Sequence, residues 1–366
     1  MGTPRPCGCK GVRTCLVCET EFGVHKRSFE FKEKYESYVY CPSCKKAWEG
    51  WDMSILSEHP NHNGKSIDYP GIYVEYEFIS PEEENILIRD LDGIPWDLSQ
   101  SGRKKQNYGP KCNFKKRKLK LGEFNGFPKF SEFVQRRFLR VPILEGFQTV
   151  EQCSLEYTPE RGASIDPHID DCWVWGERVV TVNVIGNSVL TLTRYKEGHE
   201  RYNLADVQTY PRVLNEKGEV IWKPSSESIV VEDIRKGSNV HEDNSGSKAL
   251  NSITPTSVAS YTLNEVSHAE NPVFCENIPV NVSEPYNFQE VDVDVSYPIV
   301  RVPMPARSLL VMYGSARYDW EHSVLRGDID ERRVCLAYRE FTPPFLKGGQ
   351  KEAIGKEVLQ KALNFW

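Results

Sequence analysis

The second half of the chain shows a two-residue alternation of hydrophobic and polar positions that predicts β-strands. Most of these segments are separated by turns rich in Gly, Pro or Asn. The predicted strands cover residues 150–158, 179–185, 189–195, 299–305, 308–314 and 332–341. Many short strands after a helical lead-in predict an α+β protein whose core is a β-sandwich or jelly roll with helices packed on one face.

Helical signals lie before and after these strands. A strand at 73–79 is followed by a capping box, in which Ser80 is the N-cap and Glu83 is the third helical residue. Residues 127–139 carry aromatic and aliphatic side chains at intervals of three and four, which predicts an amphipathic helix. A further helix is expected from Glu352 to Leu363, close to the end of the chain.

Changes in composition divide the sequence into segments. Six of the eleven Cys residues fall in the first 44 positions, which marks a Cys-rich head at 1–55. An extension at 70–150 precedes the strand-rich core at 151–345, and residues 346–366 carry the terminal helix. Within the core, residues 235–271 are rich in Ser, Asn and Thr with little to bury, so we expect a disordered insertion there.

Length and composition are typical of a globular protein. The 366 residues are 39% hydrophobic, and the formal net charge is −6. We find no apolar stretch of the kind that a signal peptide or a membrane span needs, so we predict a cytoplasmic and nuclear protein without a membrane partner. In such a compartment, Cys residues act as reduced thiols or metal ligands rather than as a disulfide framework.

One short motif indicates a metal centre. His168 and Asp170 lie two positions apart, so on an extended segment both side chains project from the same face. His322 is the candidate third ligand, which we place at the end of the strand at 308–314. Two imidazoles and one carboxylate form the facial triad of non-haem Fe(II) oxygenases. Asp171 is an alternative carboxylate, although the same-face argument favours Asp170.

Two arginines strengthen this interpretation. Arg333 and Arg339 are six residues apart on a predicted strand and therefore share a face. A dicarboxylate cosubstrate needs a bidentate cationic partner for its distal carboxylate, which Arg supplies and Lys does not. Without such a cosubstrate, the two would be an ordinary surface pair.

The order of these motifs resembles that of the AlkB family of 2-oxoglutarate dioxygenases. The resemblance runs from about Tyr73 to Phe345. Two further segments are similar to the fourth animal homologue of that family: CGCKGVRTCLVCE in the Cys-rich head and QSGRKKQNYGPK at 100–111. The resemblance implies a double-stranded β-helix core, a substrate lid formed by the 70–150 extension, and Fe(II) with 2-oxoglutarate and dioxygen as reactants.

Individual roles follow from the same resemblance. It implies that His168, Asp170 and His322 bind the iron, that Arg333 pairs with the distal carboxylate of 2-oxoglutarate, and that Arg339 lies near its other end. Tyr157 matches a tyrosine that reaches the cosubstrate.

The Cys-rich head has the spacing of a zinc site. Cys15 and Cys18 form one CxxC pair, and Cys41 with Cys44 forms another, which together have the layout of a four-thiolate site. Further candidate ligands are Cys7, Cys9 and His25. The set that binds Zn(II) therefore stays open, two sites are an alternative, and some of these thiols could instead be free.

The segment from Arg103 to Lys120 contains nine Lys or Arg residues and no acidic residue. Tyr108 and Phe114 lie among them, a mixture that suits phosphate contact combined with base stacking. A solvated basic loop, or a nuclear-localisation signal at 115–120, is the alternative interpretation.

The predicted reaction is oxidative N-demethylation. The resemblance implies methylated lysine on a protein, with actin as the associated partner, or methylated adenine in DNA as substrate. The main alternative is a non-catalytic zinc-binding adaptor with a vestigial iron site, which would contain zinc but no iron. A third hypothesis is a dioxygenase that hydroxylates without demethylating.

Overall fold

The computed structural model describes residues 5–26, 31–223, 283–288, 292 and 296–366. These residues all fall within one compact unit, Met1–Ser225 with Val282–Trp366. The predicted insertion at 235–271 lies outside the described residues.

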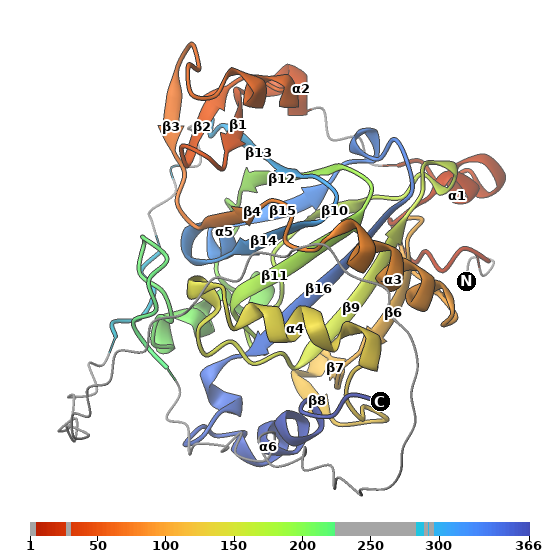
Figure 1. The fold of residues 1–366 in the computed structure, drawn as a ribbon, viewed down its shortest axis with the longest axis vertical. Coiled ribbons are helices and arrows are strands. Elements are labelled where there is room, and N and C mark those ends of the chain that lie inside the picture. Colours follow the sequence, from red (N-terminus) through yellow and green to blue (C-terminus); the bar gives the residue numbers. More distant parts are fainter. Residues whose placement is uncertain (1–4, 27–30, 224–282, 289–291, 293–295) are drawn as a thin grey trace, which may run out of the picture. The chain divides into compact units, whose positions relative to one another are not determined.

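Two seven-stranded sheets make up the core of this unit (Figure 1). Sheet A contains, in spatial order, β10 (Ile165–His168), β15 (Trp320–Val324), β12 (Ser188–Arg194), β13 (Ile299–Met304), β1 (Ser37–Cys41), β2 (Lys46–Glu49) and β3 (Ser66–Asp68). Sheet B contains β4 (Ile72–Glu75), β14 (Ser308–Met312), β11 (Trp175–Ile185), β16 (Arg333–Phe341), β9 (Glu151–Tyr157), β6 (Lys104–Tyr108) and β5 (Asp97–Leu98). Neighbouring strands are antiparallel except β1 and β13, which are parallel.

The alternation of side chains along β11 explains how sheet B is buried on both faces. Val179 belongs to the hydrophobic cluster between the two sheets, together with Leu192 and Val300 of sheet A. Val180 and Val182 face the other way and join the cluster under the helices. Because both faces are covered, most positions of this strand are buried, including the polar residues Glu177, Arg178 and Asn183.

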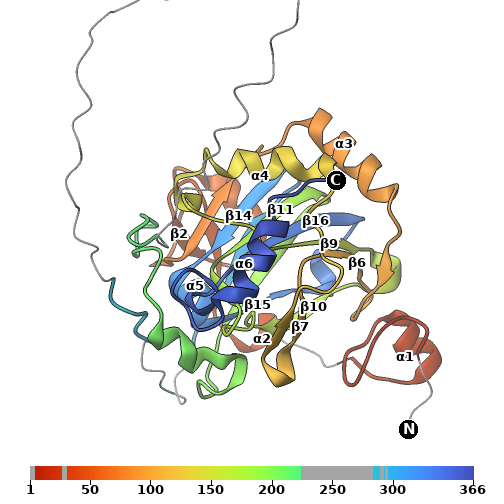
Figure 2. The same cartoon turned by 90° about the horizontal axis from the view of Figure 1, so that it is seen from below.

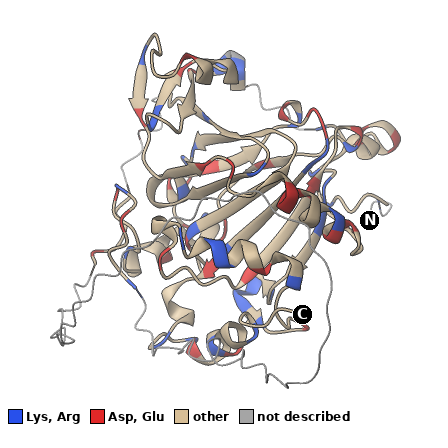
Figure 3. Cartoon of the chain, viewed as in Figure 1, with Lys and Arg blue, Asp and Glu red and all other residues tan. Residues whose placement is uncertain are grey.

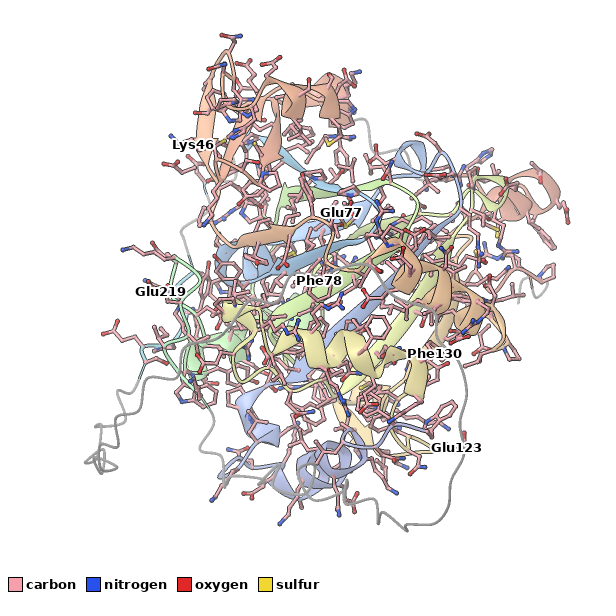
Figure 4. All side chains as sticks on the ribbon, in the orientation of Figure 1. Lys46, Glu77, Phe78, Glu123, Phe130 and Glu219 are labelled. Carbon is pink, nitrogen blue, oxygen red and sulfur yellow. The ribbon has the colours of Figure 1, made fainter. Side chains whose placement is uncertain are left out.

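Helices α3 (Pro81–Asp92) and α4 (Glu132–Phe138) cover the outer face of sheet B (Figure 2). Phe78 and Phe130, labelled in Figure 4, pack into the same cluster. The predicted capping box is confirmed, because the Ser80 amide donates to Glu83 Oε2 at 2.8 Å and the Glu83 amide donates to Ser80 Oγ at 3.2 Å. Arg137 of α4 donates to the same Glu83 carboxylate, which ties the two helices together.

The six strands predicted in the second half are confirmed, but three local predictions differ. The strand predicted at 73–79 ends at Glu75 and is followed by a turn, in which Glu77 has φ 51°. The helix predicted at 127–139 begins as a 3₁₀ turn, Lys129–Ser131, before α4. His322 does not lie at the end of the strand at 308–314, because the short helix α5 (Gly314–Tyr318) intervenes and His322 lies within β15.

The Cys-rich head is not separate from the core. After α1 (Leu16–Phe22) and α2 (Phe31–Lys34), the chain forms β1, which pairs with β13 and so extends sheet A. Glu19 of α1 accepts two hydrogen bonds from Arg326, at 2.9 and 2.7 Å. The sequence missed this continuity because strand pairing across about 260 residues leaves no local signal.

The basic segment and the last helix lie together at one end of sheet B. Strands β7 (Lys111–Asn113) and β8 (Lys118–Lys120) form a two-stranded hairpin. The hairpin packs through Cys112 and Leu119 into a cluster that also contains Val358 of α6 (Glu352–Lys361). Among the described helices, none is long and apolar enough to cross a membrane.

Candidate active site

The three predicted iron ligands come together in the structure. Strands β10 and β15 are neighbours in sheet A with His168 directly opposite His322, and the two ring centroids are 4.2 Å apart. Asp170 follows β10, and its Oδ1 lies 3.7 Å from His168 Nε2. The candidate ligand atoms of all three residues lie within 4.8 Å of one another. Asp171 points elsewhere, since its Oδ1 accepts from Asn203 at 2.7 Å.

Local contacts hold His168 in the tautomer that a metal needs. His168 Nδ1 lies 2.9 Å from the carbonyl oxygen of Asp166. Because a carbonyl can only accept, Nδ1 carries the proton and Nε2 keeps its lone pair free for a cation. Burial lowers the pKa of His168 and, more strongly, that of His322. Both imidazoles are therefore neutral at physiological pH.

Asp170 is kept ionised by Arg339. Burial alone would raise the pKa of this carboxyl, but the nearby Arg339 guanidinium holds it well below its usual range. Arg339 donates from Nε to Asp170 Oδ2 at 2.8 Å and from Nη1 to Glu151 Oε2 at 2.7 Å. Glu151 lies opposite Arg339 on β9. The guanidinium thus orients a candidate iron ligand, whereas its predicted contact with the cosubstrate stays a prediction.

A small cavity beside the triad has the features of a dicarboxylate site. Its volume is about 70 Å³, and its lining includes His168, His322, Arg333, Arg339 and Tyr157 among mostly apolar side chains. The two arginines share the inner face of β16, as their spacing predicted. Apolar walls with a few convergent polar groups are typical of small-molecule sites.

Arg333 is the group most clearly prepared for an anion. It is 1% exposed, and its Nε donates to Asn183 Oδ1 at 2.8 Å. The guanidinium lies 4.7 Å from the centroid of the Tyr157 ring, directly across the β9–β16 pair. Arg333 Nη1 is buried and has no partner among the described residues. An unpartnered buried guanidinium nitrogen is costly, so a carboxylate here would satisfy it.

These residues fit the two groups that the motifs predicted. The donor set of two neutral imidazoles and one carboxylate suits Fe(II). The orphaned nitrogen of Arg333 suits one end of 2-oxoglutarate. Burial raises the pKa of the Tyr157 phenol despite nearby Arg103 and Arg333, so Tyr157 stays protonated and able to donate.

The two CxxC pairs of the head do not form one site. Cys15 and Cys18 lie with Cys7 and Cys9 in a buried four-thiol cluster, in which Cys7 Sγ is 3.1 Å from Cys18 Sγ. The other pair lies with two histidines in a second cluster, which consists of Cys41, Cys44, His59 and His62. The hypothesis of two sites therefore fits the structure better than one site built from both pairs, because β1 carries the second pair into sheet A. His25 belongs to neither cluster among the described residues.

The basic segment forms part of sheet B and then the β7–β8 hairpin, on which Figure 3 shows Lys and Arg in blue. Tyr108 is half-buried near Trp366, whereas Phe114 at the hairpin turn is 48% exposed. Arg117 pairs with Asp206 in the 3₁₀ segment Arg201–Thr209.

Sequence patterns missed three residues that the site uses. Glu151 and Asn183 hold the two arginines, and Arg317 is a fully buried cation close enough to lower the pKa of Asp170. Glu151 is placed beside Arg339 by the register between β9 and β16, and the sequence alone does not reveal that register. Asn183 interrupts a run of β-branched residues, and that interruption is a usable signal.

Two sheets with a facial triad and a cationic cavity define a class, the 2-oxoglutarate-dependent non-haem Fe(II) dioxygenases. Comparison with known proteins shows which family within this class is meant: the chain belongs to the AlkB family of these enzymes. It is 36% identical over 361 residues to the human alpha-ketoglutarate-dependent dioxygenase alkB homolog 4, covering 99% of this chain and 94% of that protein. The mouse protein of the same name is 35% identical over 359 residues, covering 98% and 94%. Family membership implies Fe(II), 2-oxoglutarate and dioxygen.

A more distant relative is the DNA N6-methyl adenine demethylase of Caenorhabditis elegans, 26% identical over 370 residues and covering 97% of this chain and 93% of that protein. The chain also resembles the solved structure of OsALKBH1, with a TM-score of 0.36, 8% identity, and coverage of 75% of this chain and 100% of that one. That similarity is too low to carry an argument. No family model matches the chain. The adaptor hypothesis is not favoured by relatives that are enzymes.

Proposed function

We propose that this protein removes methyl groups from nitrogen by oxidation, and that its substrate is N6-methyladenine in DNA. The proposal includes a double-stranded β-helix core, in which His168, Asp170 and His322 hold the iron and Arg333 holds the distal carboxylate of 2-oxoglutarate. With both groups bound, the centre supplies oxidation of a C–H bond by dioxygen, coupled to release of succinate and carbon dioxide. A hydroxylated N-methyl group then leaves as formaldehyde.

The chain's own residues prepare this chemistry. Arg339 keeps Asp170 ionised and correctly oriented, and the Asp166 carbonyl fixes the His168 ring. The apolar lining of the cavity excludes water from the reacting groups. Such a reaction requires no protein general base at the methyl group, so positioning is the main task of the protein.

The observation that carries the choice of DNA is the exposed β7–β8 hairpin. Lys115, Lys116, Lys118 and Lys120 are exposed and surround the half-exposed ring of Phe114. Cations contact phosphates without regard to sequence, and an aromatic ring offers a surface on which a base can stack. A hairpin with both is suited to a nucleic-acid strand.

The hairpin also has a contact path to the iron ligands. Arg117 pairs with Asp206, and the segment that contains Asp206 places Asn203 against Asp171. Asp171 is the neighbour of the iron ligand Asp170. This path links the hairpin to the metal centre, and on that basis we assign the hairpin to the predicted substrate lid.

The name of the C. elegans relative supports the same substrate, and it is the only one of the three reported relatives whose name specifies a substrate. Methylated lysine on a protein, actin by family resemblance, is the other candidate. The same hairpin cations would attract an acidic protein surface. The two candidates share the reaction and differ in what the hairpin contacts.

Formaldehyde release from each substrate tests the proposal. Iron-loaded protein with 2-oxoglutarate would be given an N6-methyladenine oligonucleotide or a monomethyl-lysine actin peptide. We expect release from the oligonucleotide and a strong loss of kcat/KM in the Lys115→Glu, Lys118→Glu double variant. Arg140→Glu, at an exposed position outside the hairpin and just after α4, should change little.

The salt dependence adds a second readout. Each lost phosphate contact should reduce the slope of log K against log salt by about 1. Release from the peptide alone would move the substrate assignment to protein, and release from neither would reject demethylation.

Two further proposals accompany this function. The four-thiol cluster of Cys7, Cys9, Cys15 and Cys18 is a candidate structural zinc site, since four buried sulfurs close together match tetrahedral Zn(II). A cytoplasmic and nuclear location is proposed from the basic run at 115–120, and a fluorescent fusion lacking that run should lose its nuclear fraction.

A further inference from the structure

The end of β1 and the segment that follows it bring together four side chains. They lie outside the iron centre and outside the four-thiol cluster. They are Cys41, Cys44, His59 and His62, and their candidate ligand atoms all lie within 4.8 Å of one another. We propose that this cluster is a second, structural zinc site of the Cys₂His₂ type. It goes beyond the dioxygenase reaction and does not depend on it.

The two cysteines lie on a turn that presents both sulfurs in one direction. Cys41 is the last residue of β1, and the Lys45 amide donates to the Cys41 carbonyl oxygen at 2.8 Å across the turn into β2. Lys45 adopts a left-handed conformation with φ 58°. The tight turn therefore holds the two sulfurs close together, within reach of one ion.

The two histidines approach from the loop that follows β2. His59 Nδ1 lies 3.9 Å from Cys41 Sγ, and the His59 and His62 ring centroids are 5.6 Å apart. Ligands of a tetrahedral zinc lie about 3.3–3.8 Å from one another, given its bond lengths to nitrogen and sulfur. Since no pair of candidate ligand atoms is more than 4.8 Å apart, a contraction of about 1.5 Å or less would close the site around an ion.

His62 provides an independent observation. Both of its ring nitrogens are buried and have no hydrogen-bond partner among the described residues. The ring stacks on Trp48, with centroids 4.7 Å apart, and Trp48 Nε1 in turn donates to Cys44 Sγ at 3.3 Å. Buried imidazole nitrogens without partners are costly, and a metal bond would satisfy one of them. Trp48 orients both a thiolate and an imidazole, as residues behind metal ligands do.

The cluster has no ligand position left for a substrate, so its role is structural. Two thiolates and two neutral imidazoles neutralise one Zn²⁺ and complete a tetrahedron. The ion would tie the loop after β2 to the β1–β2 turn. That loop contains Trp51, whose ring lies 3.9 Å from the guanidinium of Arg301 on β13. Zinc at this position would therefore fasten the loop onto the outer strands of sheet A.

Zinc content of the full-length chain tests the proposal. The parent protein carries His168→Ala, so that the iron centre cannot retain zinc, and weakly bound metal is removed by gel filtration. Cys44→Ala and His62→Ala should each lower the zinc content by about one equivalent per chain. Cys112→Ser and His199→Ala, a cysteine and a histidine outside every cluster, should leave it unchanged. Unchanged zinc in Cys44→Ala and His62→Ala would overturn the proposal.

A ligand exchange separates lost coordination from lost folding. His62→Cys offers a thiolate in place of an imidazole, so this variant should keep the equivalent of zinc that His62→Ala loses. Loss of that zinc from His62→Cys as well would count against the site. Zinc-edge X-ray absorption on a Cys15→Ser, Cys18→Ser chain should then show two sulfur and two nitrogen neighbours. A spectrum with oxygen neighbours only would contradict it.

Discussion

Replacing Arg333 by alanine should weaken 2-oxoglutarate binding far more than it weakens the fold. The guanidinium is almost completely buried, is oriented by Asn183, and has one nitrogen without a partner among the described residues. Removing one partner of a buried, hydrogen-bonded charge pair costs about 2–5 kcal/mol. At 1.4 kcal/mol for each factor of ten, that corresponds to an increase of about 30- to 4,000-fold in the dissociation constant.

The adjacent residue supplies a matched control. Arg332 lies on the opposite face, where it pairs with Asp92 and Glu156 and its side chain is 34% exposed. Exposed ion pairs contribute about 0–1 kcal/mol to the stability of a fold. Arg332→Ala should therefore leave the fold intact, and because Arg332 faces away from the cavity, it should leave the cosubstrate affinity unchanged. Arg333→Lys should lie between the parent and Arg333→Ala, because it keeps the charge but loses the bidentate fork.

The assay is a calorimetric titration of iron-loaded protein with 2-oxoglutarate under anaerobic conditions, with circular dichroism to establish that each variant is folded. A folded Arg333→Ala variant with the affinity of the parent would refute the cosubstrate assignment. Equal weakening in Arg332→Ala would show that the effect is not specific to the buried guanidinium.

Three further changes probe the site and its scaffold. Arg339→Ala should lower Fe(II) affinity at least tenfold in a metal titration, because Asp170 loses the cation that keeps it ionised and oriented. Leu336→Ala, in the fully buried cluster beneath the helices, should lower the free energy of unfolding in urea by about 2–5 kcal/mol. Leu139→Ala, at a position 84% exposed, should change it by less than about 0.5 kcal/mol. Ser80→Ala should cost about 1 kcal/mol in the same assay through loss of the helix cap, and no change would mean that the capping box does not stabilise α3.

Local signals in the sequence were sufficient for six strands of the core, for the helix cap and for two of the three candidate iron ligands. Strand alternation, the capping box at Ser80, and the spacing of His168 and Asp170 all depend on neighbours within a few residues. The common face of Arg333 and Arg339 followed from the period of a strand. Each of these features is determined by residues that lie close to it in the sequence.

Features that depend on register between distant segments were not accessible in the same way. The pairing of Glu151 with Arg339 requires the β9–β16 register, and the parallel pairing of β1 with β13 joins segments far apart in the chain. Spacing alone grouped Cys15, Cys18, Cys41 and Cys44, because both pairs have the same form. The path of β1 separates them, and the loop that follows β2 brings two histidines to the second pair.

The most direct test of the enzymatic account measures succinate and formaldehyde together, from iron-loaded protein supplied with 2-oxoglutarate, oxygen and an N6-methyladenine oligonucleotide. The account predicts equal amounts of the two products from the parent protein and neither product from His322→Ala, which lacks one iron ligand. Equal turnover by the variant would contradict the iron assignment, and succinate without formaldehyde would contradict demethylation of this substrate.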